Sequence, residues 1–180
     1  MSTNKVFTTR DYILYLLNKM ELAKTGKIRL NKLAFFVEFG YIFKTGKPLS
    51  DAEYAGIDMG PVINDYKQIL ARMEKAGDIK IDGNRVIPLK TPRTIPDQVQ
   101  SIIDPLIKRF DAQTDRMLVN SSHTTDAYKI TTKDERVMGK VIDKNLANLE
   151  TAFFDEKSVD DTPMEIPIVK REKLVPYEFG

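Results

Sequence analysis

The segment from Leu30 to Lys44 constrains the fold of this chain more than any other. Its apolar residues lie on every side of a helix, with Leu30, Leu33, Ala34, Val37 and Tyr41 on one face and Phe35, Phe36, Phe39 and Phe43 on the others. A helix that is apolar nearly all round is usually buried, because each of its faces needs cover. The sequence therefore predicts a buried helix at the centre of the fold.

The size and composition of the chain predict one globular domain. It has 180 residues, of which 42% are hydrophobic, and this is enough to fill a single core. We expect that domain to span residues 1–154. The tail from 155 to 180 has a different character, because Pro163, Pro167 and Pro176 are spaced among apolar residues. Prolines exclude a helix there and favour an extended segment lying on a surface.

Several classes of protein are excluded by composition. The chain has no Cys and one His, so disulfides and the usual zinc sites cannot form, and we expect neither a metal nor a cofactor. A net charge of +2 is too small for a protein that coats nucleic acid. No run approaches the roughly 18 apolar residues of a membrane span, and the N-terminus lacks the apolar core of a signal peptide. We expect a cytoplasmic protein with no membrane contact.

Local signals predict further elements in the first half of the chain. Thr8 can cap a helix that ends before Gly26, where glycine would supply the left-handed C-terminal residue. Pro61, after Gly60, suits the first position of a helix that runs to Gly77. Alternating residues at 79–81 and 85–87, around Asp-Gly-Asn, predict a β-hairpin. Residues 49–59 are expected to be a loop with at most a short extended piece at 54–57.

The second half is predicted to hold two more helices. An apolar stripe runs from Val99 to Phe110, and Pro105 within it predicts either a kink or a helix that begins near Asp104. Residues 119–131 show no sustained period and are expected to form a loop or a short turn. A last helix is expected from about 132 to 153. The predicted fold class is therefore mainly α, a compact helical domain with one small β-hairpin in winged-helix-like order.

Few residues here are arranged for chemistry. Ser121, Ser122 and His123 include a nucleophile and a base, but neighbours in sequence rarely meet with the geometry that catalysis needs. We expect His123 to act as a cap or a hydrogen-bonded loop residue, and the protein to be no enzyme. The acidic residues Asp51, Glu53 and Asp58 match no calcium-loop spacing and are expected to form a solvated loop.

The order of helix, helix and hairpin leaves DNA binding open as an alternative. The basic residues that would contact phosphates are Lys67, Arg72, Lys75, Lys80 and Arg85. Acidic residues interrupt this set, so we regard DNA as an improbable partner.

A series of spaced motifs resembles a known family. The motifs are Arg29 to Phe36, Thr45-Gly46-Lys47-Pro48-Leu49, Met59-Gly60-Pro61-Val62, Tyr66, and Ser122-His123-Thr124. In this order, over roughly residues 8–130, they resemble the Panacea domain of SocA-like antitoxins, a family that includes phage-associated GepA-like proteins. Two positions depart from the pattern. Arg29 stands where the family often has an apolar residue or Lys, and Tyr128 stands where a Trp is common.

The resemblance implies a function in a toxin-antitoxin system, in a prophage setting. Such a protein neutralises a toxin encoded in an adjacent gene by direct protein binding, although SocA-like members act as adaptors that deliver the toxin to a protease. The signature positions are Lys32, Gly60, Pro61, Tyr66 and His123, and each either contacts the toxin or has a structural role. The tail at 156–180 either contributes to partner contact or self-association, or packs back on its own domain.

Overall fold

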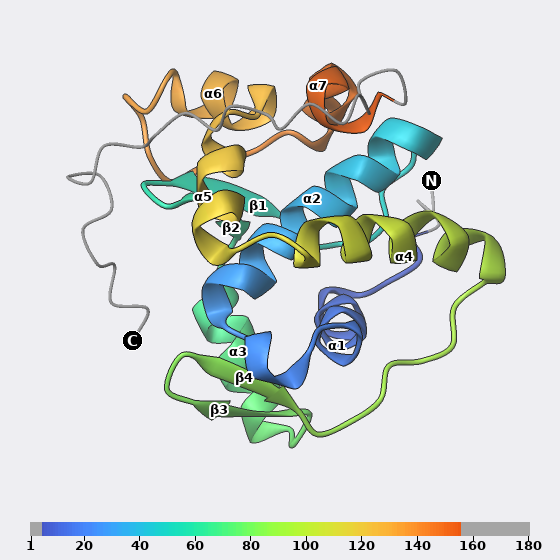
Figure 1. The fold of residues 1–180 in the computed structure, drawn as a ribbon. Coiled ribbons are helices and arrows are strands. Elements are labelled where there is room, and N and C mark those ends of the chain that lie inside the picture. The colour runs from blue at the N-terminus through green and yellow to red at the C-terminus, as the bar shows by residue number, and fades with distance from the viewer. Residues whose placement is uncertain (1–4, 156–180) are drawn as a thin grey trace.

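A computed structural model gives the fold, and it describes residues 5–155 (Figure 1). The chain begins with α1 (Thr9–Lys19), the short 3-10 helix η1 (Leu22–Lys24) and α2 (Lys27–Thr45). Strands β1 (Tyr54–Ile57) and β2 (Gly60–Ile63), helix α3 (Tyr66–Lys75) and strands β3 (Ile79–Asp82) and β4 (Arg85–Pro88) follow. The remaining elements are α4 (Asp97–Asp111), α5 (Asp115–His123), α6 (Asp126–Thr132), β5 (Lys140–Val141), η2 (Lys144–Leu149) and α7 (Thr151–Phe154).

Helix α2 is the buried centre of the fold, as its composition predicts. It packs against α1, α4, α5, α7, β2 and η2, so every face is covered. Phe36 stacks on Phe110 of α4 with ring centroids 4.4 Å apart. A side chain at Gly40 would approach Leu106 and Phe154 to 2.9 Å, which shows how closely α4 and α7 lie against this helix. Gly46, with φ +70°, ends the helix in the left-handed conformation.

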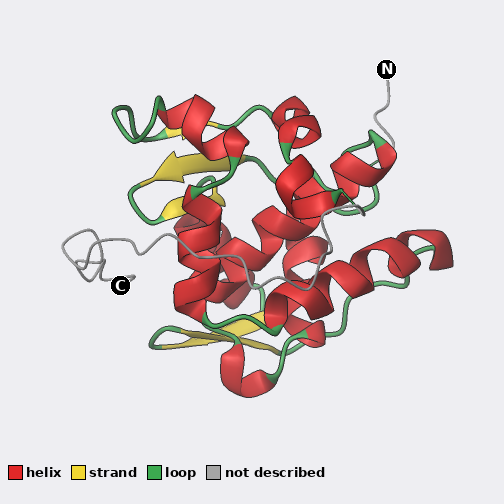
Figure 2. Cartoon of the chain, turned by 45° about the horizontal axis from the view of Figure 1, so that its top comes forward, coloured by secondary structure: helices red, strands yellow, loops and turns green. Residues whose placement is uncertain are grey.

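The fold is mainly α, as expected, with the predicted hairpin present as β3 and β4. Figure 2 shows a second small sheet elsewhere on the helical body. This sheet is antiparallel, in the order β2-β1-β5. Only β1 falls where a short extended piece was expected.

The start of the molecule follows the prediction up to Lys19. Thr8 caps α1 by accepting from the amide of Asp11 at 3.2 Å. Gly26 does not end this helix, and that prediction is wrong. Gly26 has a φ of −69° and directly precedes α2. The segment around it forms hydrogen bonds with the β3–β4 hairpin instead of ending α1. There Thr25 accepts from the amide of Val86, and Lys27 donates to Asn84.

Gly60 and Pro61 begin a strand, so the predicted helix start at Gly60-Pro61 is wrong. Pro61, in β2, stands opposite Gly56 of β1, and α3 begins only at Tyr66. The physical reason is pairing over distance. Proline lacks an N–H and is tolerated at a helix start and in some strand positions alike, and the strand is stabilised by partners that local signals do not reveal.

The second half departs further from prediction. α4 runs from Asp97 through Pro105, so a start near Asp104 is wrong; Pro105 is exposed, where water can satisfy the carbonyl it leaves unbonded. The loop expected at 119–131 is formed by the end of α5 and most of α6.

The helix expected at 132–153 is also wrong. Lys133, Asp134 and Glu135 all have positive φ and turn the chain away from a helical path after α6. β5, η2 and α7 follow instead, and the apolar side chains of Met138 and Val141 are exposed.

From residue 156 on, the predicted extended tail lies outside the described residues. Within 5–155 no helix has both the length and the apolar content needed to cross a membrane.

Candidate binding site at the β1–β2 turn

Four of the five signature positions meet at the turn that joins β1 to β2, which we define as residues 57–60. Lys32 reaches it from α2 and His123 from the end of α5, while Gly60 and Pro61 belong to the turn and the strand after it. The fifth, Tyr66, is the first residue of α3 and is buried in the core.

Lys32 lies inside the protein, with 1% of its surface exposed. Its Nζ donates to the carbonyl oxygen of Pro61 at 2.9 Å. Burial lowers the pKa of this amine to about 7, because the charged form loses its hydration and gains no carboxylate partner among residues 5–155. The side chain therefore holds β2 against α2 and does not reach solvent.

Gly60 permits the close packing of these groups. Its φ is +90°, and a Cβ there would overlap Ser122 Oγ and lie 3.1 Å from Lys32 Nζ. The hydroxyl of Ser122 is itself buried and donates to Val119 at 2.7 Å. Only glycine fits this position, on grounds of both conformation and space.

His123 connects α5 to the same turn. Its Nδ1 lies 2.8 Å from the carbonyl oxygen of Val119, and its Nε2 lies 2.7 Å from that of Asp58. Both ring nitrogens of His123 are therefore engaged by backbone carbonyl oxygens. Glu135 Oε1 lies 3.7 Å from Nε2.

Tyr128 also supports the turn, a role that no pattern in the sequence indicates. Its hydroxyl donates to the carbonyl oxygen of Ile57 at 2.7 Å, and its ring packs edge-on against His123. Burial raises the pKa of this phenol, so it remains a donor. Lys32, His123 and Tyr128 thus contact three backbone carbonyls of the β1–β2 hairpin. Because every residue has a backbone carbonyl, such contacts cannot be recognised from residue types in the sequence.

The side chains of Ser122 and His123 make contacts within the protein. Ser122 is buried, and both nitrogens of His123 lie within hydrogen-bond distance of backbone carbonyl oxygens. The side chain of Asp58 is exposed at the tip of the turn. Lys32, His123 and Tyr128 fix the backbone conformation of the β1–β2 hairpin.

The other sequence candidates do not gather into a site. Asp51 accepts hydrogen bonds from the amide and hydroxyl of Thr9 at 2.6 Å, while Asp58 belongs to the turn. Residues 5–155 contain no group of three carboxylate or histidine side chains placed to hold a metal ion. The basic residues Lys67, Arg72 and Lys75 are exposed on α3, but the β1–β2 hairpin separates α3 from α2 and interrupts the winged-helix order.

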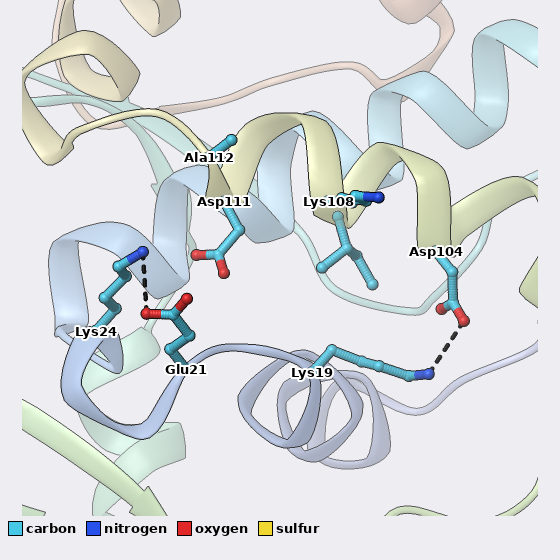
Figure 3. Close-up of a pocket in the computed structure, with 8 residues that line it drawn as sticks. Lys19, Glu21, Lys24, Asp104, Lys108, Asp111 and Ala112 are labelled. Atoms are coloured by element: carbon cyan, nitrogen blue, oxygen red, sulfur yellow. Dashed lines mark hydrogen bonds and ion pairs between the residues drawn. The ribbon is translucent and has the colours of Figure 1, made fainter.

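A charged groove between α1 and α4 is shown in Figure 3. Lys19 pairs with Asp104 across it at 3.0 Å, and Lys24 pairs with Glu21 at 3.1 Å. Asp111 is bound by the buried Arg29, one of the two departures from the family pattern. Most of the charges that line this groove are therefore paired within the protein.

Comparison with known families gives the context of this turn. The family model described as "Antitoxin SocA-like, Panacea domain" matches residues 30–161. The match begins later and ends later than the motifs indicate, and it includes all five signature positions. The chain belongs to this family of SocA-like antitoxins. No curated protein and no solved structure matches the chain significantly.

Proposed function

We propose that this protein is the antitoxin of a toxin-antitoxin pair and neutralises its toxin by stoichiometric binding, with no bond made or broken by its own side chains. The observation that carries the proposal is the antitoxin family match over residues 30–161. The partner is a protein toxin encoded in an adjacent gene, and the two meet in the cytoplasm.

The arrangement at the β1–β2 turn supports a binding role. The polar signature side chains Lys32 and His123 are engaged in internal hydrogen bonds, each to a carbonyl of this hairpin. A braced loop loses little conformational entropy when it binds, so such bracing favours affinity. We infer that the turn, with the exposed Asp58 at its tip, is part of the surface that contacts the toxin.

Co-expression with the neighbouring open reading frame tests the class of function. We expect growth to be restored and a complex of fixed stoichiometry to co-purify. Growth rescue without a stable complex, or turnover of a substrate by the purified protein, would contradict binding as the mechanism. If the toxin's half-life fell sharply in the presence of this chain and a cellular protease, the protein would be an adaptor.

The role of the turn is tested separately with a matched pair of variants. Asp58→Lys reverses the charge at the tip of the β1–β2 turn, and Asp82→Lys does the same at the exposed end of β3 in the other hairpin. We expect the first to weaken toxin binding at least tenfold and the second to change it less than twofold. Equal affinities would remove the turn from the contact surface and leave the antitoxin assignment intact.

A further inference from the structure

Strand β5 forms one border of the three-stranded sheet. Val141 stands opposite Ala55 of β1, and the next amide, that of Ile142, donates inward to Tyr54 at 2.8 Å. Backbone groups alternate in direction along an antiparallel strand, so the N–H and C=O of Val141 face away from β1. Within residues 5–155 no other strand pairs with that side of β5.

The surface at this border is apolar and open in the described part of the chain. The side chain of Val141 is 53% exposed, and Met138, just before the strand, is 37% exposed. Helix α6 packs against β5 and carries a further exposed residue, Ile130. Sheet borders of this kind accept an added strand unless something covers them.

The same chain holds a segment that fits. The described residues end at Asp155, directly after α7, and 25 residues follow. Ten of these residues lead from Asp155 to Glu165, and at about 3.3 Å per residue they could extend roughly 33 Å. α6 packs against both β5 and η2, the element before α7, so the border lies well within that reach.

The pattern Ile166-Pro167-Ile168 is suited to a strand with one free side. In an extended strand the backbone groups of Ile166 and Ile168 point to the same neighbour, and those of Pro167 point away. A proline facing outward loses no hydrogen bond and also blocks pairing with any further strand.

Charge favours the same placement. Lys133 and Lys140 are exposed beside the border and form no ion pair within residues 5–155. The sequence leading to Ile166 carries Glu156, Asp160, Asp161 and Glu165. We propose that residues 165–169 of this chain pair with the free side of β5, with Ile166 and Ile168 as the hydrogen-bonded residues, and so cover the border of the sheet.

Amide hydrogen exchange at Val141 in the full chain tests the pairing and its register. Ile168→Pro removes an N–H that faces β5, whereas Val169→Pro places a proline on the outer side. We expect exchange at Val141 to be at least tenfold faster in Ile168→Pro, and in a chain lacking residues 157–180, than in the unmodified protein. Val169→Pro should remain within twofold. Equal exchange in all four proteins would overturn the proposal.

A spin label gives an independent measurement. The chain has no Cys, so Glu165→Cys supplies one labelling site. We expect the label to broaden the amide signals of residues 138–142 and leave that of Leu89 sharp, because Leu89 follows β4 at the other end of the molecule (Figure 1). Absence of broadening would contradict the proposal. So would broadening that arises only between copies, when nitrogen-15 protein without the label is mixed with spin-labelled protein lacking the isotope.

Discussion

The amine of Lys32 donates a hydrogen bond to the carbonyl oxygen of Pro61, 29 residues away, in the interior of the protein. No carboxylate within residues 5–155 pairs with the amine, so the charged form is held by a neutral oxygen. A buried cation without a countercharge is costly, and the protein accepts this cost where the central helix meets the braced hairpin.

Stability should therefore depend on pH through Lys32. Its pKa is about 7 in the folded protein and near 10.4 in an unfolded chain, so between these values the unfolded state binds more protons. The free energy of unfolding should rise with pH across this window, by at most about 1.4 kcal/mol per pH unit. Urea unfolding at pH 7, 8 and 9 measures it, and Lys32→Met should lack this rise. Parallel curves for the two proteins would be inconsistent with this assignment.

Alanine at Gly60 should be more harmful than alanine at another turn glycine. Gly60 and Gly83 both have positive φ, but a Cβ would overlap Ser122 Oγ only at the first and meets nothing within 4 Å at the second. We expect Gly83→Ala to cost about 1 kcal/mol from conformation alone, and Gly60→Ala to cost at least about 2 kcal/mol. Thermal unfolding compares them. Adding Ser122→Ala should recover part of the loss at Gly60, and full additivity would show that the overlap does not matter.

The pairing of Lys144 with Glu38 should be essential to the attachment of η2. Glu38 is fully buried and accepts from Lys144 Nζ at 3.0 Å and from the amides of Leu49 and Ser50. Lys144→Met leaves a buried carboxylate without its cation, and we expect a loss of about 2–4 kcal/mol. Lys67→Met, at an exposed lysine of α3 without an ion pair in the described residues, serves as the control in chemical denaturation. Similar losses for both would argue against a specific pair.

Acid should destabilise the protein partly through Asp78. Arg10 donates to this carboxylate at 2.7 Å and Lys90 at 2.8 Å, and these bonds hold its pKa well below the usual value near 4. Because the folded state binds this proton less readily, the contribution is present above about pH 4 and is lost as pH falls further. Melting temperatures between pH 5 and 2 should therefore fall less steeply in Asp78→Asn than in the unmodified protein. An unchanged slope would exclude Asp78 as a source of acid sensitivity.

The parts of the fold that were predicted correctly depend on local pattern. Helix α2 was evident because residues 30–44 are apolar on every face, and the β3–β4 hairpin because its strands adjoin a short turn. The β2-β1-β5 sheet was missed since β5 lies more than 80 positions from β1 along the chain. Gly60 and Pro61 were noticed as a pair, but whether they begin a helix or a strand is decided by those distant partners.

The candidate site shows the same division. Family motifs pointed to Lys32, Gly60, Pro61 and His123 without indicating that they meet. Their contacts run to carbonyl oxygens, which every residue possesses, so residue type carries no information about the partner. Tyr128 went unrecognised as a site residue for this reason.

The three left-handed residues Lys133, Asp134 and Glu135 have a consequence for how this protein can be altered. Each adopts a conformation that side chains disfavour by roughly 1–2 kcal/mol, and the hydrogen bonds from the amides of Asp134 and Val137 back to α6 keep the corner in place. Lengthening or shortening the chain at this bend would misdirect everything downstream of it. Lys133→Gly, by contrast, should make the protein more stable, because glycine adopts a positive φ without steric cost.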